Sequence, residues 1–399
     1  MFCQQNNADS QRWCVLSSNG AMIGANVMNL SKSIDFLLEN AGSVIQYRLR
    51  KEILKNLKLT EEADMLERIY QTPNFKLVQS YAKPSGYIGS GMHSWDNWRG
   101  AILHETPLQD GETAARLLSY YAIPANHRLT QNFVEAMRDE DVLRVEFSYI
   151  PPEINRFETR FVGLNSGFCL MTLMYAMQAM LGCGDDGYVG TFQKTSLEAF
   201  KSILPLSSIY DIAKTRHSKA KYNYPYIEAD TYFPCQYHLE TLAYTNAWRT
   251  PESIKLMADA LNHYSQIMQG ENLIHIKIGN RYYAPFPLNM HNSAIRPFRP
   301  DLIDSITYRR LLTEIAMLGA GESVGVVRES AANIEEAISR DGILRMRLDM
   351  PHNKRYSPKS IEYPTAYADV RLEPDYKQKY ALECDLTFWA VQFLHLARE

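Results

Sequence analysis

Paired helical segments dominate the sequence, and the clearest pair lies in residues 237–268. In residues 237–247, Leu239 and Leu242 recur on one face, and in residues 251–268, Met257 and Leu261 do the same. Apolar side chains at this spacing are typical of amphipathic helices that bury one side. Only a short turn separates the two segments, so the sequence predicts an antiparallel helical hairpin.

Similar segments recur from residue 30 onward, mostly joined in pairs by short turns, with long loops after alternate helices. Recurring antiparallel pairs build a bundle, a solenoid or a closed double ring. The chain has no strict repeat of the tetratricopeptide or HEAT kind, and its loops are too long and aromatic for a plain solenoid. We therefore expect an all-α fold, an α/α toroid in which inner helices are surrounded by outer ones and loops close over one mouth.

The expected toroid is a single domain over residues 30–399, preceded by a loose segment at 1–29. Residues 156–182 are predicted as one long helix with a core-facing methionine stripe, residues 139–155 as irregular, and residues 222–230 as an aromatic loop. Residues 273–278 instead alternate with period two, and Gly279 and Asn280 can turn the chain back. This pattern predicts a small β-hairpin at one mouth.

Composition narrows the function classes. The net charge of −3 argues against a nucleic-acid or polybasic membrane surface. Six scattered cysteines without a CxxC pair indicate reduced thiols and a cytoplasmic location, and no signal peptide is evident at the N-terminus. The most apolar stretch, 168–183, is too short to span a bilayer. The 25 tyrosines suit a cavity wall that is apolar along its body and polar at its tip.

Two motifs carry a resemblance to a known superfamily. Residues 84–90, Pro-Ser-Gly-Tyr-Ile-Gly-Ser before a tryptophan-containing turn, are similar to the degenerate Asp-Gly-x-Trp loops of squalene cyclases and protein prenyltransferases. Residues 383–391 are similar to the prenyltransferase helix that carries an Asp-x-Cys zinc pair. Residues 30–399 as a whole resemble uncharacterised bacterial prenyltransferase-like or squalene-cyclase-like proteins. The resemblance implies an α/α toroid and a central cavity for an isoprenoid-like ligand.

The catalytic signatures of that superfamily are missing. The nearest match to the cyclase Asp-x-Asp-Asp motif is the segment 139–142, which ends in valine, and Asp185-Asp186 is not followed by the spacing of a metal-binding motif. Leu382 stands where the prenyltransferase zinc pair has aspartate. Cys235 and His238 lie three residues apart, but no second pair completes four zinc ligands. We therefore expect no metal and no cofactor.

Three carboxylates are the candidate catalytic groups. Glu228 and Asp230 lie among aromatic residues, where desolvation would raise the pKa of a general acid; the alternative is that they cap the following helix. Asp385, in the apolar last helix, would be a cavity acid if it faces inward, or a structural hydrogen-bonding group. Aromatic and polar side chains nearby are the candidate ligand-binding residues. These are His93, Trp95, Asp96, Trp98, Tyr226, Tyr232, His238, Tyr283, His291 and Trp389.

Three functions remain open. The first is a terpenoid cyclase- or prenyltransferase-like protein that binds an apolar, isoprenoid-sized ligand and uses a carboxylate as general acid. The second is an (α/α)6-barrel carbohydrate-active enzyme, in which tryptophans stack on sugars and two carboxylates do acid–base work. The third is a binding protein without chemistry. The sequence predicts no nucleic-acid partner and leaves the oligomeric state open.

Overall fold

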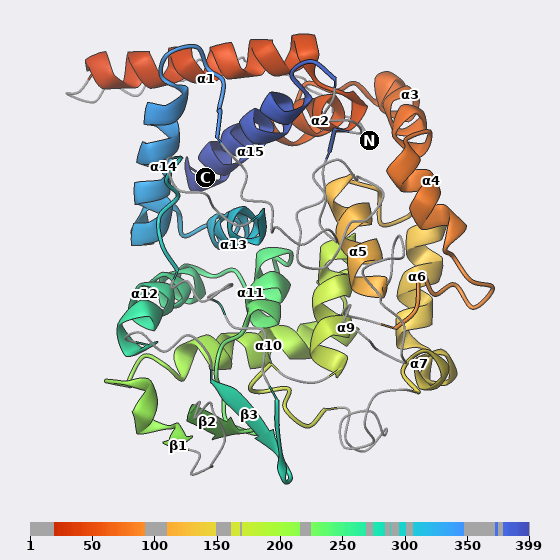
Figure 1. The fold of residues 1–399 in the computed structure, drawn as a ribbon, viewed down its shortest axis with the longest axis vertical. Helices are drawn as coiled ribbons and strands as arrows, with labels where there is room; N and C mark the ends of the chain where they lie inside the picture. The colour runs from red at the N-terminus through yellow and green to blue at the C-terminus, as the bar shows by residue number, and fades with distance from the viewer. Residues whose placement is uncertain are drawn as a thin grey trace, which may run out of the picture.

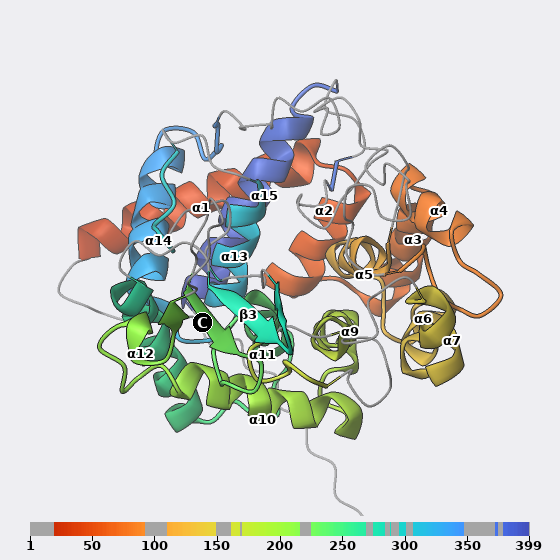
Figure 2. The same cartoon turned by 60° about the horizontal axis from the view of Figure 1, so that its bottom comes forward.

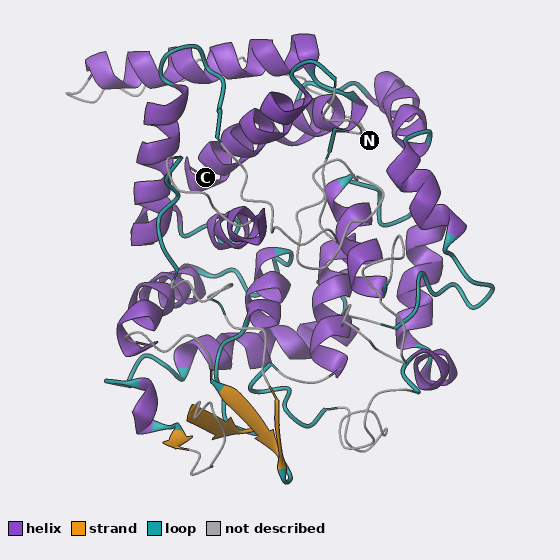
Figure 3. Cartoon of the chain, viewed as in Figure 1, coloured by secondary structure: helices purple, strands orange, loops and turns teal. Residues whose placement is uncertain are grey.

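The computed structural model describes residues 20–91, 110–148, 161–167, 170–215, 225–268, 274–283, 288, 295–300, 306–346, 372–373 and 378–398. These residues form fourteen α-helices and one small sheet, so the protein is mostly helical (Figures 1 and 3). In Figure 1 the sheet lies at the bottom, below α10, and α1 runs across the top.

The helices of the first half are mostly short. They are α1 (Gly20–Asn40), α2 (Ser43–Arg48) with a π-helical turn (Leu49–Ile53), α3 (Leu59–Tyr70), α4 (Pro73–Ser80), α5 (Gly111–Tyr120), α6 (Arg128–Arg138) and α7 (Glu140–Glu146). Side-chain caps define several starts, because a side-chain oxygen satisfies a backbone N–H that has no partner inside the helix. Thr72 accepts from Phe75 before α4, and Asp110 accepts from Thr113 at the start of α5.

The second half combines longer helices with the sheet. Its helices are α9 (Leu170–Gln178) with a π-helical turn (Ala179–Cys183), α10 (Gly187–Lys201), α11 (Gln236–Ala243), α12 (Pro251–Met268), α13 (Ile306–Ala316), α14 (Gly325–Ile338) and α15 (Ala381–Arg398). The strands are β1 (Lys214–Thr215), β2 (Pro225–Glu228), β3 (His275–Ile278) and β4 (Arg281–Tyr283). They lie in the order β1-β2-β3-β4, and only the pair β2–β3 is parallel.

Successive helices contact one another around the middle of the molecule, as Figure 2 shows from a second side. The helix α5 contacts α9, α9 contacts α11, α11 contacts α13, α13 contacts α15, and α15 contacts α2. Helices α10, α12, α14 and α1 each pack against members of this series or against one another. The series brings side chains from distant parts of the sequence to a common centre.

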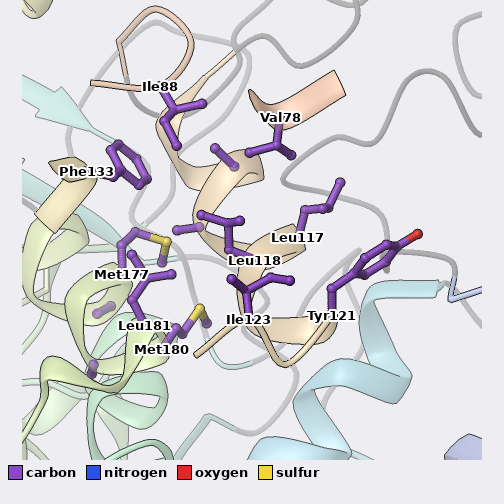
Figure 4. Packing of buried hydrophobic residues seen from close by; sticks show 14 of the residues in the cluster. Val78, Ile88, Leu117, Leu118, Tyr121, Ile123, Phe133, Met177, Met180 and Leu181 are labelled. Atoms are coloured by element: carbon purple, nitrogen blue, oxygen red, sulfur yellow. The ribbon is translucent and has the colours of Figure 1, made fainter. Parts of the chain in front are cut away.

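Two clusters of buried apolar side chains form the core, one around α2–α6 and α9 and one around α10–α14, with α15 contributing to both. Figure 4 shows part of the first cluster, where Leu118, Phe133 and Met177 from α5, α6 and α9 gather. The predicted methionine stripe is confirmed as core packing, because its members are at most 5% exposed; they are Met171, Met174, Met177 and Met180. Methionine fills irregular gaps of this kind well.

Several predicted elements are confirmed and others are wrong. The helix at 251–268 and the hairpin of β3 and β4 are confirmed. The predicted long helix at 156–182 is wrong in its first part, since residues 161–167 are a turn and α9 begins at Leu170. Residues 140–146 form α7 because Asp139 caps it by accepting from Asp141 and Val142, α1 begins at Gly20 within the segment predicted to be loose, and β2 occupies part of the predicted aromatic loop.

Candidate functional site

A cluster of charged and amide side chains lies buried where α5, α11 and α13 meet. Every member is at most 3% exposed: Glu112 and Arg116 on α5, Gln236, Tyr237 and Glu240 on α11, and Arg310 and Glu314 on α13. We call these seven residues the central cluster. Charged side chains are rarely buried this completely unless they are paired, so the cluster is the most unusual feature of the interior.

Arg116 joins the three glutamates. Its Nη2 donates to Glu112 Oε1 at 2.7 Å and to Glu240 Oε1 at 2.8 Å, and its Nη1 lies 4.0 Å from Glu314 Oε1. Burial disfavours the charged form of this guanidinium, but Glu240 and Glu112 outweigh burial and hold the pKa of Arg116 well above its ordinary value. The guanidinium therefore stays charged and holds two carboxylates close together on one nitrogen.

The amide of Gln236 and the guanidinium of Arg310 complete the connections. Gln236 Nε2 donates to Glu240 Oε1 at 3.0 Å and to Glu314 Oε2 at 3.5 Å. Arg310 Nε lies 3.7 Å from Glu314 Oε1. The hydroxyl of Tyr237 donates to Glu112 Oε1 at 3.4 Å. Three helices are thus tied to each other through polar atoms at the middle of the fold.

Local helix geometry explains how each helix presents its residues. Glu112 with Arg116, Gln236 with Glu240, and Arg310 with Glu314 are pairs four residues apart, and such pairs share one helix face.

The hydroxyl of Tyr244, next to the cluster, has a raised pKa because of burial and because Glu314 and Glu240 are near, so this hydroxyl stays protonated. None of the seven residues was singled out from the sequence, where the three spaced pairs were the available signal.

The predicted acids Glu228 and Asp230 lie elsewhere, beside the sheet. They line a pocket of about 340 Å³ between the end of β2, the β3–β4 turn and the turn at 161–167. Glu228 Oε1 accepts from Lys214 at 2.9 Å and from Lys277 at 3.5 Å, and the Lys214 hydrogen bond holds its pKa below the usual value. The expected raised pKa is therefore wrong for Glu228, because strand pairing brings lysines to it.

Removing the lysine should reverse this effect. The variant Lys214→Met is expected to raise the pKa of Glu228 toward the ordinary glutamate value, since the largest lowering contribution comes from the Lys214 hydrogen bond. An NMR titration of the Glu228 carboxyl would measure the change. Lys255→Met, which removes the partner of Asp259 on α12, is the matched control and should leave Glu228 unchanged. An unaltered Glu228 titration in Lys214→Met would contradict the assigned pairing.

Asp385 and Trp389 both lie on α15, apart from that pocket. Asp385 is 8% exposed, and its Oδ1 accepts from the backbone N–H groups of Leu372 at 3.1 Å and Glu373 at 3.2 Å. These bonds agree with the structural alternative for Asp385. Trp389 Nε1 donates to Thr313 Oγ1 at 2.9 Å, so this indole links α15 to α13.

His238 is a structural residue at the start of α11. It is fully buried, its Nδ1 accepts from the Cys235 N–H at 3.3 Å, and its Nε2 lies 3.0 Å from Leu164 O. Burial lowers its pKa to about 4, so the ring is neutral at pH 7, with the Nε2 hydrogen donated to Leu164. Gly167 lies alongside with φ 73°, and a Cβ there would overlap Cys235 Sγ. His238 therefore fixes the turn at 161–167 to α11.

Of the other predicted ligand-binding residues, those in the described part of the chain do not meet at one site. Tyr226 packs edge-on against Tyr282 at 5.0 Å within the sheet, Tyr283 lies half-buried on β4, and Tyr232 is 40% exposed. The remaining predicted residues lie outside the described part of the chain; they are His93, Trp95, Asp96, Trp98 and His291.

Among the described residues, no group of three or more histidine, cysteine or acidic side chains is arranged to hold a metal ion. Within the same residues, no helix combines the length and the apolar character needed to cross a bilayer. Comparison with known protein families, curated proteins and solved structures found no match.

Proposed function

We propose that the chain is an α/α toroid enzyme whose central cluster binds a small molecule and does acid–base chemistry. The contacts of α5, α9, α11, α13, α15 and α2 support an inner ring. Arg48 on α2 donates from Nη1 to Tyr120 O on α5 at 3.3 Å, which supports closure between the first and last members. The proposal extends the toroid of the terpenoid cyclase and protein prenyltransferase superfamily to this chain.

The observation that carries the proposal is the convergence of three buried glutamates on Arg116. Acid–base catalysis needs carboxyl groups held at fixed positions in a site that excludes water. Glu112 and Glu240 meet this need, since both bind the same Nη2 atom. We assign Glu240 the acid–base role, with Arg116 as the positioning residue, in place of Glu228, Asp230 and Asp385.

The substrate we propose first is an apolar molecule of isoprenoid size. Aromatic and sulfur-containing side chains border the cluster: Met180 Sδ lies 3.8 Å from Arg116 Nη1, and the buried Tyr237 and the half-buried Tyr244 lie beside the glutamates. The apolar bodies of these side chains provide surface against which such a molecule can pack. The proposal includes a cytoplasmic enzyme without a metal or cofactor.

A second candidate is a carbohydrate-active (α/α)6 barrel. The shared guanidinium nitrogen favours it, because glycosidases use two carboxyl groups at short separation, about 5 Å in retaining enzymes. The polar character of the central cluster also suits a ligand that forms hydrogen bonds better than a hydrocarbon.

Native mass spectrometry of the protein purified from its own host tests the proposed function. A co-purifying small molecule is expected in the wild type and in Asp230→Asn, and its loss is expected in Glu240→Gln. An isoprenoid-like mass supports the first substrate, and a sugar-like mass supports the second. Loss of the molecule in Asp230→Asn with retention in Glu240→Gln would move the site to the pocket beside the sheet. A protein free of ligand in every form would leave the cluster with a structural role only.

A further inference from the structure

On α11, two oxygen atoms of the central cluster have no hydrogen-bond partner among the described residues, whereas Glu314 Oε1 on α13 faces the guanidinium groups of Arg116 and Arg310 at 4.0 and 3.7 Å. The two oxygens on α11 are Glu240 Oε2 and Gln236 Oε1, both fully buried and both on the same face of the helix. The other oxygen of the same carboxylate, Glu240 Oε1, accepts from Arg116 and from Gln236. Each of these two side chains thus has one atom paired within the cluster and one oxygen left over, which we call its outward oxygen.

The orientation of the Gln236 amide follows from its neighbours. Its Nε2 faces Glu240 Oε1 and Glu314 Oε2, and a flipped amide would place an oxygen against these two carboxylate oxygens. Amide orientations are assigned from such networks. The outward position therefore belongs to Gln236 Oε1, which can only accept.

Leaving two buried acceptors unmet is costly, at about 1–3 kcal/mol for each group and more when it is charged. Native proteins contain few such atoms, and each one calls for an explanation. A hydrocarbon offers no donor and would leave both oxygens unmet. A cationic donor would meet the guanidinium groups of Arg116 and Arg310 in the same cluster, both of which stay charged. A neutral hydroxyl group satisfies the acceptors without that repulsion.

We propose that the ligand of the central cluster carries hydroxyl groups that donate to Glu240 Oε2 and Gln236 Oε1. This inference rests on the proposed function and defines its substrate class as an alcohol. Two sources share this chemistry, a sugar and an isoprenoid alcohol. A hydroxyl donated to Glu240 would also lie where a carboxylate can remove its proton.

The variant Glu240→Gln isolates the outward oxygen. Arg116 and Gln236 both bring donors to Oε1, so the new amide is expected to keep its oxygen there and to place its NH2 at the former Oε2 position. The internal hydrogen bonds are retained, while the outward atom changes from an acceptor to a donor. Thr241→Val is the matched control, because Thr241 lies on α11 and its hydroxyl donates to the backbone oxygen of Tyr237 and not to the cluster.

Binding is measured by isothermal titration calorimetry with three probes: glucose, farnesol, and farnesane, the saturated hydrocarbon that has the carbon skeleton of farnesol. Glucose or farnesol is expected to bind the wild type and Thr241→Val, and at least about tenfold more weakly to Glu240→Gln, a change of about 1.4 kcal/mol. The alcohol that binds identifies the source. Circular dichroism on heating verifies that each variant is folded.

The results that overturn the inference differ from those that overturn the proposed function. Farnesane binding as tightly as farnesol, or equal alcohol binding by Glu240→Gln, leaves the cluster a ligand site but removes the hydroxyl assignment. Binding of none of the three probes, together with a crystal structure in which water alone meets Glu240 Oε2, overturns both. If Glu240→Gln does not fold, Gln236→Met takes its place in the binding measurement. Gln236→Met removes the second outward oxygen and is expected to weaken alcohol binding.

Discussion

Arg116→Met is expected to lower the free energy of unfolding by about 3–5 kcal/mol, the usual cost of removing one partner from a buried ionic group. Methionine fills a similar volume, so the loss comes from charge and not from a cavity. Glu112 and Glu240 would lose the guanidinium nitrogen that they share and would remain buried. Urea denaturation followed by circular dichroism measures the change.

Arg138→Met provides the matched control for this prediction. Arg138 pairs with Asp186, but both side chains are partly exposed, at 31% and 40%. Exposed ion pairs contribute about 0–1 kcal/mol, so the control should lose much less stability. Adding Glu240→Gln to Arg116→Met should recover part of the loss, since the double variant buries one negative charge fewer. Equal losses in the two arginine variants would contradict a cluster that depends on burial.

Local patterns in the sequence predicted much of the secondary structure. In residues 251–268, apolar side chains recur at helical spacing over eighteen residues, and α12 has these bounds. The hairpin of β3 and β4 follows from period-two alternation around Gly279. The predicted helix at 156–182 was wrong in its first part, because apolar content alone does not mark where a helix begins. The preferred double ring stays a prediction that the helix contacts support.

The central cluster could not be predicted from local patterns. A pair such as Glu112 and Arg116 looks the same on a solvated helix face as in a buried one. Its burial depends on partners 124 residues away on α11, as for Arg116 and Glu240. Only the packing of α5, α11 and α13 reveals that three such pairs meet.

The pKa of Glu228 depends on tertiary structure in the same way. Strand pairing places Lys277 opposite Glu228 on β3, and Lys214 lies on the neighbouring strand β1. Aromatic neighbours in the sequence suggested desolvation, whereas the folded chain leaves the Glu228 side chain 37% exposed and paired with lysines. The predicted roles of His93, Trp95, Asp96, Trp98 and His291 stay predictions.

Acidification is expected to destabilise the protein through His238 by roughly 3 kcal/mol between pH 6.5 and pH 4. Burial lowers the pKa of His238 from 6.5 to about 4, so the unfolded state takes up a proton before the folded state does. The contribution of His238 to the free energy of unfolding is fully present above pH 6.5 and is lost as the pH falls to about 4. Protonation would also place a hydrogen on Nδ1, which now accepts from the Cys235 N–H. Urea midpoints measured across this range give the slope.

His238→Gln should be less stable than the wild type at pH 7 but should lose most of the slope, because glutamine does not titrate. His263→Gln is the matched control: His263 is a half-buried residue on α12 whose Nε2 lies 2.8 Å from Leu206 O. Carboxylates with lowered pKa, such as Glu228 and Asp185, also contribute as the pH falls, so the difference between wild type and variant is the quantity that isolates His238. A wild-type slope that persists unchanged in His238→Gln would show that the buried ring is not the group responsible. His238 lies in the first turn of α11, the helix that carries Gln236 and Glu240. Ligand binding at the central cluster should therefore weaken over the same pH range.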